Sequence, residues 1–289
     1  MMGYVPCLAF QEWLDYMVES ATFLAGDLDA KIIYLDQLGS GASICERTDH
    51  QHKSPEPHFY GERKLTQRIR EAIPEDAVIC SEAHPEDTRL QFQNAFYQGG
   101  ILRYLTRQIQ VPMNMTRFAF PDVKCFNNIH GYVLTDNNWE RLKFVLFNGD
   151  AFFMPRAYDP ASFFGKEATL DFRKLFRIQH EYADAFTSSD VEPLIPTLIP
   201  GTFVNQFRAD EKVIWTVFNA NYRTAKGKLL EIAAKPATQY VDLWNGAPIT
   251  TNTAGDTTWL VVEIGPRDVA CISEVPEKKS TSQLSIGAE

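Results

Sequence analysis

Two short apolar segments of the chain each end in a carboxylate. The first, residues 31–36, closes with Asp36, and the second, residues 77–82, closes with Glu82. Both are rich in isoleucine, leucine and valine, and a short run of such residues predicts a buried strand. A charged group directly after a buried strand must either emerge at the end of the sheet or find a partner. The pattern therefore predicts two strands that each present an acid at the carboxyl end.

Helical spacing of hydrophobic residues alternates with these strands. It runs over residues 11–25 before the first strand and over 60–73 between the two. The alternation continues with weaker signals, which predict helices over 102–109, 139–147 and 169–186 and strands within 116–126 and at 149–154. Alternating strands and helices indicate parallel α/β units, of which about four can be counted.

The hydrophobic period changes to two after residue 200. Proline and serine cluster over 187–200, and Gly201 follows them. Beyond them, short alternating segments lie at 203–207, 213–218, 228–232, 239–244, 259–264 and 269–273. Strands at this spacing predict a small antiparallel β-sandwich. We therefore expect an α/β region over 1–188, a β-sandwich over 189–276 and a charged, serine-rich, disordered tail over 277–289.

The two acids are the strongest candidates for chemistry. Glu82 lies 46 positions after Asp36, which suits one strand–helix–strand step with an enlarged loop. Adjacent strands lie about 4.8 Å apart, and glycosidases that retain configuration need about 5–5.5 Å between two carboxyl groups. We therefore predict Asp36 as nucleophile and Glu82 as acid/base of a retaining glycosidase. Alternatively, Asp36 caps a turn, and Glu82 pairs with Arg63 or Arg89.

Polar residues close to the acids in sequence are candidates for sugar binding. Gln37 could donate a hydrogen bond to a sugar hydroxyl, and His58 lies in the polar loop that follows the first strand. His84, two positions after Glu82, could tune that acid by hydrogen bonding. These three side chains complete the predicted site around the two carboxylates.

The sequence offers little support for a metal or a cofactor. The loop over 45–58 carries metal-capable side chains, but His50 and His52 are only two positions apart and the loop has no Cys-x-x-Cys pair. We therefore predict no metal site. No glycine-rich phosphate-binding motif is present either, so no cofactor is predicted.

Charge and cysteine usage narrow the possible partners. The formal charge of −9 argues against nucleic acid, whose partners usually carry a basic surface. Five widely scattered cysteines indicate free thiols and a reducing compartment. The first residues lack the basic region of a signal peptide, and no apolar run approaches the roughly 20 residues of a membrane span. These features predict a cytoplasmic protein without a membrane or nucleic-acid partner, and they leave its oligomeric state unknown.

A family resemblance rests on the same residues. The string Ile33-Tyr-Leu-Asp-Gln-Leu-Gly39, then Val78-Ile-Cys-Ser-Glu82, then aromatic strands, resembles the later part of glycoside hydrolases. The similarity is to the broad group of α-amylase-like and endo-α-N-acetylgalactosaminidase-like barrels, and especially to the uncharacterised barrel domains grouped with them. It covers residues 10–275. In that group an Asp ends the fourth strand as nucleophile and a Glu ends the fifth as acid/base, which implies these roles for Asp36 and Glu82. A third acid often follows, and Asp122 or Asp150 could fill its place, so Asp150 joins the predicted substrate contacts.

The resemblance also implies a fold and a function. It implies the C-terminal part of a TIM (β/α)₈-type barrel followed by the small antiparallel β-sandwich. Counterparts of strands one to three are not present, so the chain is either a C-terminal fragment, which we favour, or an unusual half-barrel. The implied activity is hydrolysis of O-glycosidic bonds in a poly- or oligosaccharide with retention of configuration. The alternative is a non-catalytic carbohydrate-binding protein derived from a truncated barrel.

Overall fold

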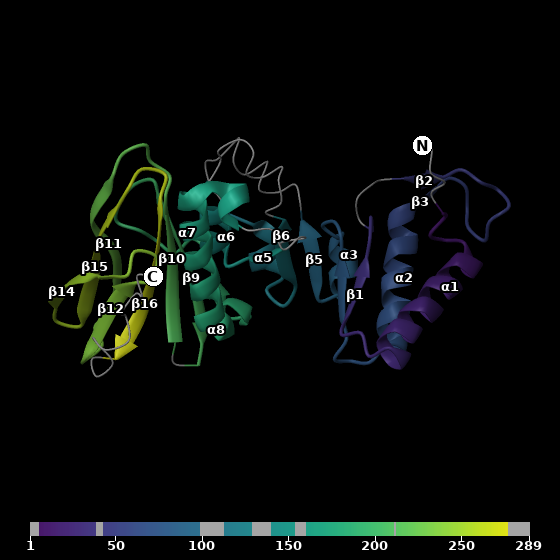
Figure 1. Cartoon of the computed structure of the whole chain (residues 1–289), viewed down its shortest axis with the longest axis horizontal. Helices are drawn as coiled ribbons and strands as arrows, with labels where there is room; N and C mark the ends of the chain where they lie inside the picture. The colour runs from purple at the N-terminus through teal and green to yellow at the C-terminus, as the bar shows by residue number, and fades with distance from the viewer. Residues whose placement is uncertain are drawn as a thin grey trace. The chain divides into compact units, whose positions relative to one another are not determined.

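The computed structural model describes residues 6–38, 43–98, 113–128, 140–153, 160–210 and 212–276 (Figure 1). By its internal contacts the chain divides into two compact units. Unit 1 comprises Met1–Gly99 and Val123–Phe126, and unit 2 comprises Gly100–Asp122 and Asn127–Glu289. The predicted boundary after residue 188 stays a prediction. The predicted helix over 102–109 and the predicted tail over 277–289 lie outside the described residues.

Unit 1 contains the first predicted helices and strands. Its elements are α1 (Gln11–Thr22), a π-helical turn η1 (Phe23–Asp27), β1 (Ile32–Leu35), β2 (Ile44–Cys45), β3 (Glu56–Pro57), α2 (His58–Ala72), β4 (Val78–Ser81), α3 (Asp87–Leu90), β5 (Ala95–Gln98) and the start of β6 (Lys124–Asn128). The predicted helices at 11–25 and 60–73 and the predicted strands at 31–36 and 77–82 are confirmed. β5 was not predicted, because four residues are too few to show an alternation of hydrophobic and polar positions.

The strands of unit 1 form a sheet in the order β1-β4-β5-β6. β1 pairs with β4 in parallel, with Ile33 opposite Ile79 and Leu35 opposite Ser81. β4 pairs with β5 in parallel as well. Because parallel neighbours point the same way, the residues that follow β1 and β4 emerge at the same edge of the sheet.

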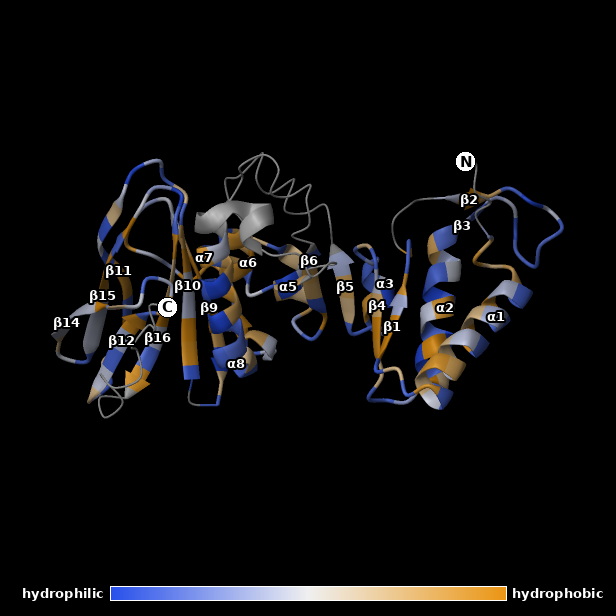
Figure 2. Cartoon of the chain, viewed as in Figure 1, coloured by the Kyte–Doolittle hydropathy of each residue, from blue (hydrophilic) through white to orange (hydrophobic). Residues whose placement is uncertain are grey.

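Helices α1 and α2 share one hydrophobic core with the strands of unit 1. Leu14, Leu65 and Ile69 from the helices pack with Ile33 and Ile79 from the strands. β1 and β4 are coloured mostly hydrophobic in Figure 2, whereas α2 alternates between hydrophobic and hydrophilic residues, as an amphipathic helix should. The alternate residues of β1, Ile32 and Tyr34, are 62% and 47% exposed. One face of β1 is therefore buried and the other is open.

Gly61 brings the first turn of α2 close to the segment before α1. A Cβ atom at this position would lie 2.4 Å from the backbone carbon and oxygen of Leu8. Real Cβ atoms do not approach backbone atoms so closely, so only glycine fits here. The contact holds Leu8, and with it the neighbouring Cys7, against α2.

Unit 2 begins with helices. They are α5 (Met115–Ala119), α6 (Glu140–Asn148), α7 (Pro160–Glu181) and α8 (Ala183–Thr187), with β7 (Ala151–Phe153) between α6 and α7. The predicted helices at 139–147 and 169–186 and the strand at 149–154 are confirmed, although the second helix is divided at Tyr182. In the described part of the chain, no helix is both long enough and apolar enough to cross a membrane.

The strand predicted within 116–126 is confirmed at the end of this range, after a helix that was not predicted. Residues 115–119 form the helix α5, and the strand β6 begins only at Lys124. Arg117 of this helix is buried, where it donates a hydrogen bond of 2.8 Å to the carbonyl of Phe186 and lies over the ring of Phe207. Pro121 follows the end of this helix, as is typical of a helix stop.

The rest of unit 2 consists of antiparallel strands. They are β8 (Val191–Glu192), β9 (Thr202–Ala209), β10 (Lys212–Asn219), β11 (Ala225–Ala233), β12 (Thr238–Asp242), β13 (Ala247–Pro248), β14 (Thr250–Ala254), β15 (Thr257–Ile264) and β16 (Val269–Pro276). One sheet has the order β13-β12-β16-β10-β9-β8, and the other has the order β11-β15-β14. All six predicted strands after residue 200 are confirmed.

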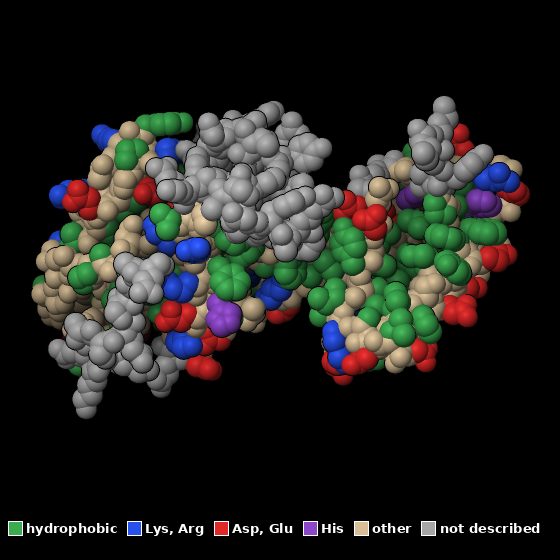
Figure 3. Space-filling view, in the orientation of Figure 1, with side chains coloured by type: hydrophobic (Ala, Val, Ile, Leu, Met, Phe, Trp, Pro, Cys, Tyr) green, Lys and Arg blue, Asp and Glu red, His purple; other side chains and the backbone are tan. Residues whose placement is uncertain are grey.

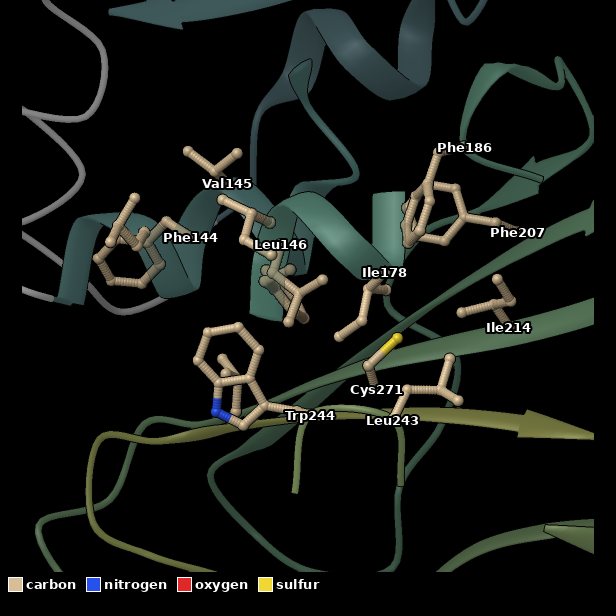
Figure 4. Packing of buried hydrophobic residues seen from close by; sticks show 14 of the residues in the cluster. Phe144, Val145, Leu146, Ile178, Phe186, Phe207, Ile214, Leu243, Trp244 and Cys271 are labelled. Carbon is tan, nitrogen blue, oxygen red and sulfur yellow. The ribbon is translucent and has the colours of Figure 1, made fainter. Parts of the chain in front are cut away.

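Two hydrophobic cores hold unit 2 together. One lies between the two sheets and includes Trp215 and Leu260. The other lies where α6, α7 and α8 cover the larger sheet, and Figure 4 shows Phe186 of α8 beside Phe207 of β9. The helices before residue 188 therefore pack directly on the strands that follow it.

Candidate active site

Asp36 and Glu82 occupy equivalent places at the ends of two neighbouring parallel strands. Asp36 follows Leu35, Glu82 follows Ser81, and Leu35 and Ser81 are partners in the β1–β4 register. The backbone N–H of Glu82 continues the ladder by donating to the carbonyl of Leu35 at 3.1 Å. Asp36 is exposed and Glu82 is half-buried. The two acids thus leave the sheet side by side, at the same edge.

The turn after β1 binds the carboxylate of Glu82. The backbone N–H of Gln37 donates to Glu82 Oε2 at 2.6 Å. Gln37 has a φ of 56°, a left-handed conformation that costs a residue with a side chain free energy and so must be held by its surroundings. A further bond of 3.2 Å from Ala83 N–H to the carbonyl of Leu38 fixes the same turn. Gln37 therefore contacts Glu82 through its backbone, and its exposed side chain keeps the predicted role toward a sugar as a prediction.

Two tyrosines that were not predicted accompany the acids. Burial, and after it the charges of Glu82 and Asp36, raises the pKa of Tyr34. Burial, and after it the charge of Glu82, raises the pKa of Tyr97. The two rings meet edge to face with centroids 6.4 Å apart. Tyr34 could have been found from sequence, because it lies two positions before Asp36 and so shares its side of the strand. Tyr97 could not, because it depends on the pairing of β5.

The arginines considered as partners of Glu82 are engaged elsewhere. Arg89 is fully buried and pairs with Glu62 of α2. The guanidinium of Arg63 lies 5.7 Å from the ring centre of Phe92. In the structure Glu82 therefore does not form an ion pair with Arg63 or Arg89.

The two predicted histidines differ in position. His84 is half-buried, with its ring 5.0 Å from that of Phe96. His58 is the first residue of α2 and is buried. Burial, and after it the charge of His52, lowers the pKa of His58. The backbone N–H of His58 also donates to the carbonyl of Ser43, at 3.0 Å, so His58 is connected with the segment before α2. The roles of His58 and His84 in binding sugar stay predictions.

Asp150 lies in unit 2 and is buried, with 1% of its surface exposed. Its carboxylate accepts hydrogen bonds from the Nδ2 atoms of Asn114, at 3.1 and 3.2 Å, and of Asn127, at 2.9 Å. Burial raises the pKa of Asp150 to about 6, against the opposing effects of these two bonds and of the charge of Arg117. These contacts connect α5, β6 and β7, and a role of Asp150 toward substrate stays a prediction.

The raised pKa of Asp150 predicts a pH-dependent stability. The native carboxyl binds its proton more tightly than the unfolded one, whose pKa is near 3.8. Between pH 4 and pH 6 the native state therefore holds more protons, and the free energy of unfolding falls as the pH rises. The free energy of unfolding should fall by about 3 kcal/mol over this range, because the pKa of Asp150 is roughly two units higher in the native state. We expect Asp150→Asn to remove this loss, because asparagine does not ionise and a rotated amide of Asn114 or Asn127 can still pair with it.

Urea unfolding of both proteins at several pH values checks this prediction. The difference between wild type and Asp150→Asn is the useful quantity, because the other carboxyl groups titrate equally in both. A difference that does not change between pH 4 and pH 6 would contradict the burial of an ionisable Asp150.

Solved structures that share this fold include glycoside hydrolases of the α-amylase family. The α-amylase of Anoxybacillus has a TM-score of 0.57 and 10% identity, over 92% of this chain and 63% of its own. The debranching enzyme of Nostoc punctiforme has a TM-score of 0.58 and 10% identity, over 92% and 62%. The α-amylase of Geobacillus thermoleovorans, solved with acarbose, has a TM-score of 0.56 and 9% identity, over 92% of this chain and 64% of its own.

At such low identity the likeness shows the fold alone. That fold is a mixed α/β arrangement with a parallel sheet and antiparallel sheets, as in part of these amylases. The chain spans less than two thirds of the length of these three enzymes. The chain matches no protein-family model and none of the curated proteins.

Proposed function

We propose that this chain forms the part of a retaining glycoside hydrolase that carries its two catalytic carboxylates. Asp36 is the nucleophile, Glu82 is the acid/base, and the substrate is an O-glycosidic bond in an oligo- or polysaccharide. One observation carries the proposal: the paired ends of β1 and β4 deliver the two acids together. The Gln37 N–H, which donates to Glu82 Oε2 at 2.6 Å, holds one of them in place. In this proposal, unit 1 belongs to a (β/α) barrel and the two antiparallel sheets of unit 2 form a β-sandwich.

The chemistry follows from the spacing of the strands. Neighbouring strands are about 4.8 Å apart, which suits the roughly 5–5.5 Å between carboxyl groups of a retaining enzyme better than the longer separation of an inverting one. Asp36 attacks the anomeric carbon while protonated Glu82 gives its proton to the leaving oxygen. The resulting glycosyl ester on Asp36 is then hydrolysed by water that Glu82 deprotonates. Two inversions at one carbon restore the starting configuration.

The surroundings of the acids supply contacts for a sugar. Tyr34, which is 47% exposed, and Tyr97 offer phenol groups and ring surfaces beside the carboxylates. Gln37 offers an exposed amide. The similar α-amylase of Geobacillus was solved with acarbose, and AmyP was solved with maltose and with maltotriose. These ligands support a carbohydrate as the substrate class.

Trapping of the glycosyl intermediate tests the proposal. The chain is incubated with 5-fluoro glycosyl fluorides of gluco and galacto configuration in both anomeric forms, and the product is digested and analysed by mass spectrometry. We expect one sugar, attached to the peptide that contains Asp36. A label on another acid would overturn the assignment. Binding of maltotriose without any label or turnover would favour the non-catalytic carbohydrate-binding alternative.

A further inference from the structure

Two cysteines and two histidines from separate parts of unit 1 converge at one place. Cys7 precedes α1, Cys45 belongs to β2, and His50 and His52 lie in the connection between β2 and β3. One ligand atom from each of the four lies within 4.8 Å of the others. Figure 3 shows histidine side chains on the visible surface of unit 1 near these elements. The prediction of no metal site rested on residues 45–58, whereas Cys7 lies 38 positions before Cys45.

Two of the distances between the ligand atoms fall in the range of the edges of a zinc tetrahedron, and all four atoms lie within 4.8 Å of one another. Cys7 Sγ lies 3.3 Å from His52 Nε2, and Cys45 Sγ lies 3.4 Å from His50 Nδ1. Bond lengths of about 2.3 Å for zinc to sulfur and 2.0–2.1 Å for zinc to nitrogen give tetrahedral edges of about 3.3–3.8 Å. The sequence spacing of the four residues is unusual for a zinc site, but their ligand atoms lie close enough together for one ion to contact all four.

The backbone prepares His52 to act as a ligand. Its Nδ1 lies 2.9 Å from the carbonyl of Lys53. A carbonyl only accepts, so Nδ1 carries the proton and the lone pair is on Nε2, the atom that faces Cys7. A metal-binding histidine usually donates its other ring N–H to a carbonyl or a carboxylate in this way, which fixes the orientation of the ring. The ring of His50 is supported as well, because it lies 5.0 Å from the ring of Phe10.

We infer that Cys7, Cys45, His50 and His52 bind one zinc ion as a structural site. Two thiolates and two imidazoles in a tetrahedral arrangement select zinc over magnesium and calcium, which require oxygen ligands. A two-iron cluster with two cysteines on one iron and two histidines on the other fits poorly, because here each cysteine lies beside a histidine. Four protein ligands close the coordination shell, so the site is structural rather than catalytic.

The site would reinforce the exposed hydrogen bonds by which Gln51 of the loop contacts Gln11 and Glu12 of α1, both 3.4 Å long. The segment 46–55 between β2 and β3 contains no helix or strand. Zinc would cross-link this loop to the segment before α1, which Gly61 already holds against α2 through Leu8. Because zinc binds the folded arrangement and not a separated set of ligands, it would stabilise the fold of this region. The inference does not depend on the proposed glycosidase activity.

Metal analysis of the purified chain tests the inference. The protein is purified without chelator, and its zinc content is measured by mass spectrometry of the metal. We expect about one zinc per chain, and at most about a tenth of that in Cys7→Ser and Cys45→Ser, since removing one of four ligands opens the site. Cys125→Ala, which removes a buried cysteine outside the cluster, should keep the full content.

Cobalt binding to the wild-type chain gives a second measurement of the site, and this measurement does not depend on whether the variants fold. Titration of the metal-free wild-type chain with Co²⁺ should produce the intense visible bands of tetrahedral cobalt with thiolate ligands, and one equivalent of Zn²⁺ should remove them. His52→Gln should shift or abolish these bands. Wild-type protein without zinc and without cobalt bands would overturn the inference. So would a Cys7–Cys45 disulfide in freshly purified protein, because it would show that the two thiols are paired with each other instead.

Discussion

Replacing Asp36 by asparagine should reduce glycoside turnover by about 10⁴-fold or more. The variant keeps the size of the side chain but removes the carboxylate that forms the ester intermediate. Glu82 and its bond to Gln37 N–H do not involve the Asp36 side chain, so the site should otherwise persist. The measurement is kcat/KM for the aryl glycoside that the wild-type chain hydrolyses fastest.

Replacing Glu82 by glutamine should have a different signature. The loss of acid/base catalysis is expected to cost about 10²–10⁴-fold for a sugar leaving group. The rate of forming the glycosyl ester on Asp36 should fall much less for a substrate with a dinitrophenol leaving group, because this group departs without a proton. Azide added to Glu82→Ala should yield a glycosyl azide of retained configuration, and azide added to Asp36→Ala should yield the inverted one.

Matched controls lie at the opposite end of the same strands. Glu75 and Asp76 are exposed acids in the turn before β4, and Asp76 pairs with Lys31. Asp76→Asn and Glu75→Gln make the same chemical changes as the active-site variants and should leave kcat/KM unchanged. If the controls and the active-site variants lose activity equally, the effect is one of folding or net charge. If Asp36→Asn and Glu82→Gln both retain wild-type turnover, the assignment of the two acids is wrong.

The two acids could be predicted because their signals are local. A short apolar run followed by one charged residue is visible in the sequence at both Asp36 and Glu82, and the helix between them fixes a parallel pairing. The bond from Gln37 N–H to Glu82 could not be predicted, because it depends on a left-handed turn at a residue that is not glycine. The sequence therefore located the acids but not the contact that orients one of them.

Two further contacts could not be predicted because they join residues that are distant in sequence. Tyr97 reaches the site through the pairing of β5 with β4, and Cys7 reaches the loop through the packing of α2 against Leu8. Neither relation leaves a periodic signal. Within 116–126 the sequence predicted a short strand, but it did not predict that residues 115–119 form a helix before that strand.

Replacing Glu62 by glutamine should destabilise unit 1 by about 3–5 kcal/mol. Arg89 of α3 is fully buried, and its guanidinium pairs with Glu62 and lies 3.8 Å from Glu86. Burial lowers the pKa of Arg89, against the charges of Glu86 and Glu62 that favour its protonated form. The loss of Glu62 would leave a buried cation with only the more distant carboxylate. The measurement is the free energy of unfolding in urea, together with hydrogen exchange of the α2 and β4 amides, which reports on unit 1 alone.

The double variant separates the cost of an unpaired charge from the value of the pair. Glu62→Leu with Arg89→Met removes both charges and fills similar volume, so it should be less destabilised than Glu62→Gln alone. Glu71→Gln makes the same change on an exposed position of α2 and should leave the unfolding midpoint unchanged. A Glu62→Gln protein as stable as wild type would show that Arg89 gains no net stabilisation from Glu62. In that case the position of α3 beside α2 would have to depend on apolar contacts, such as those of the buried Leu90.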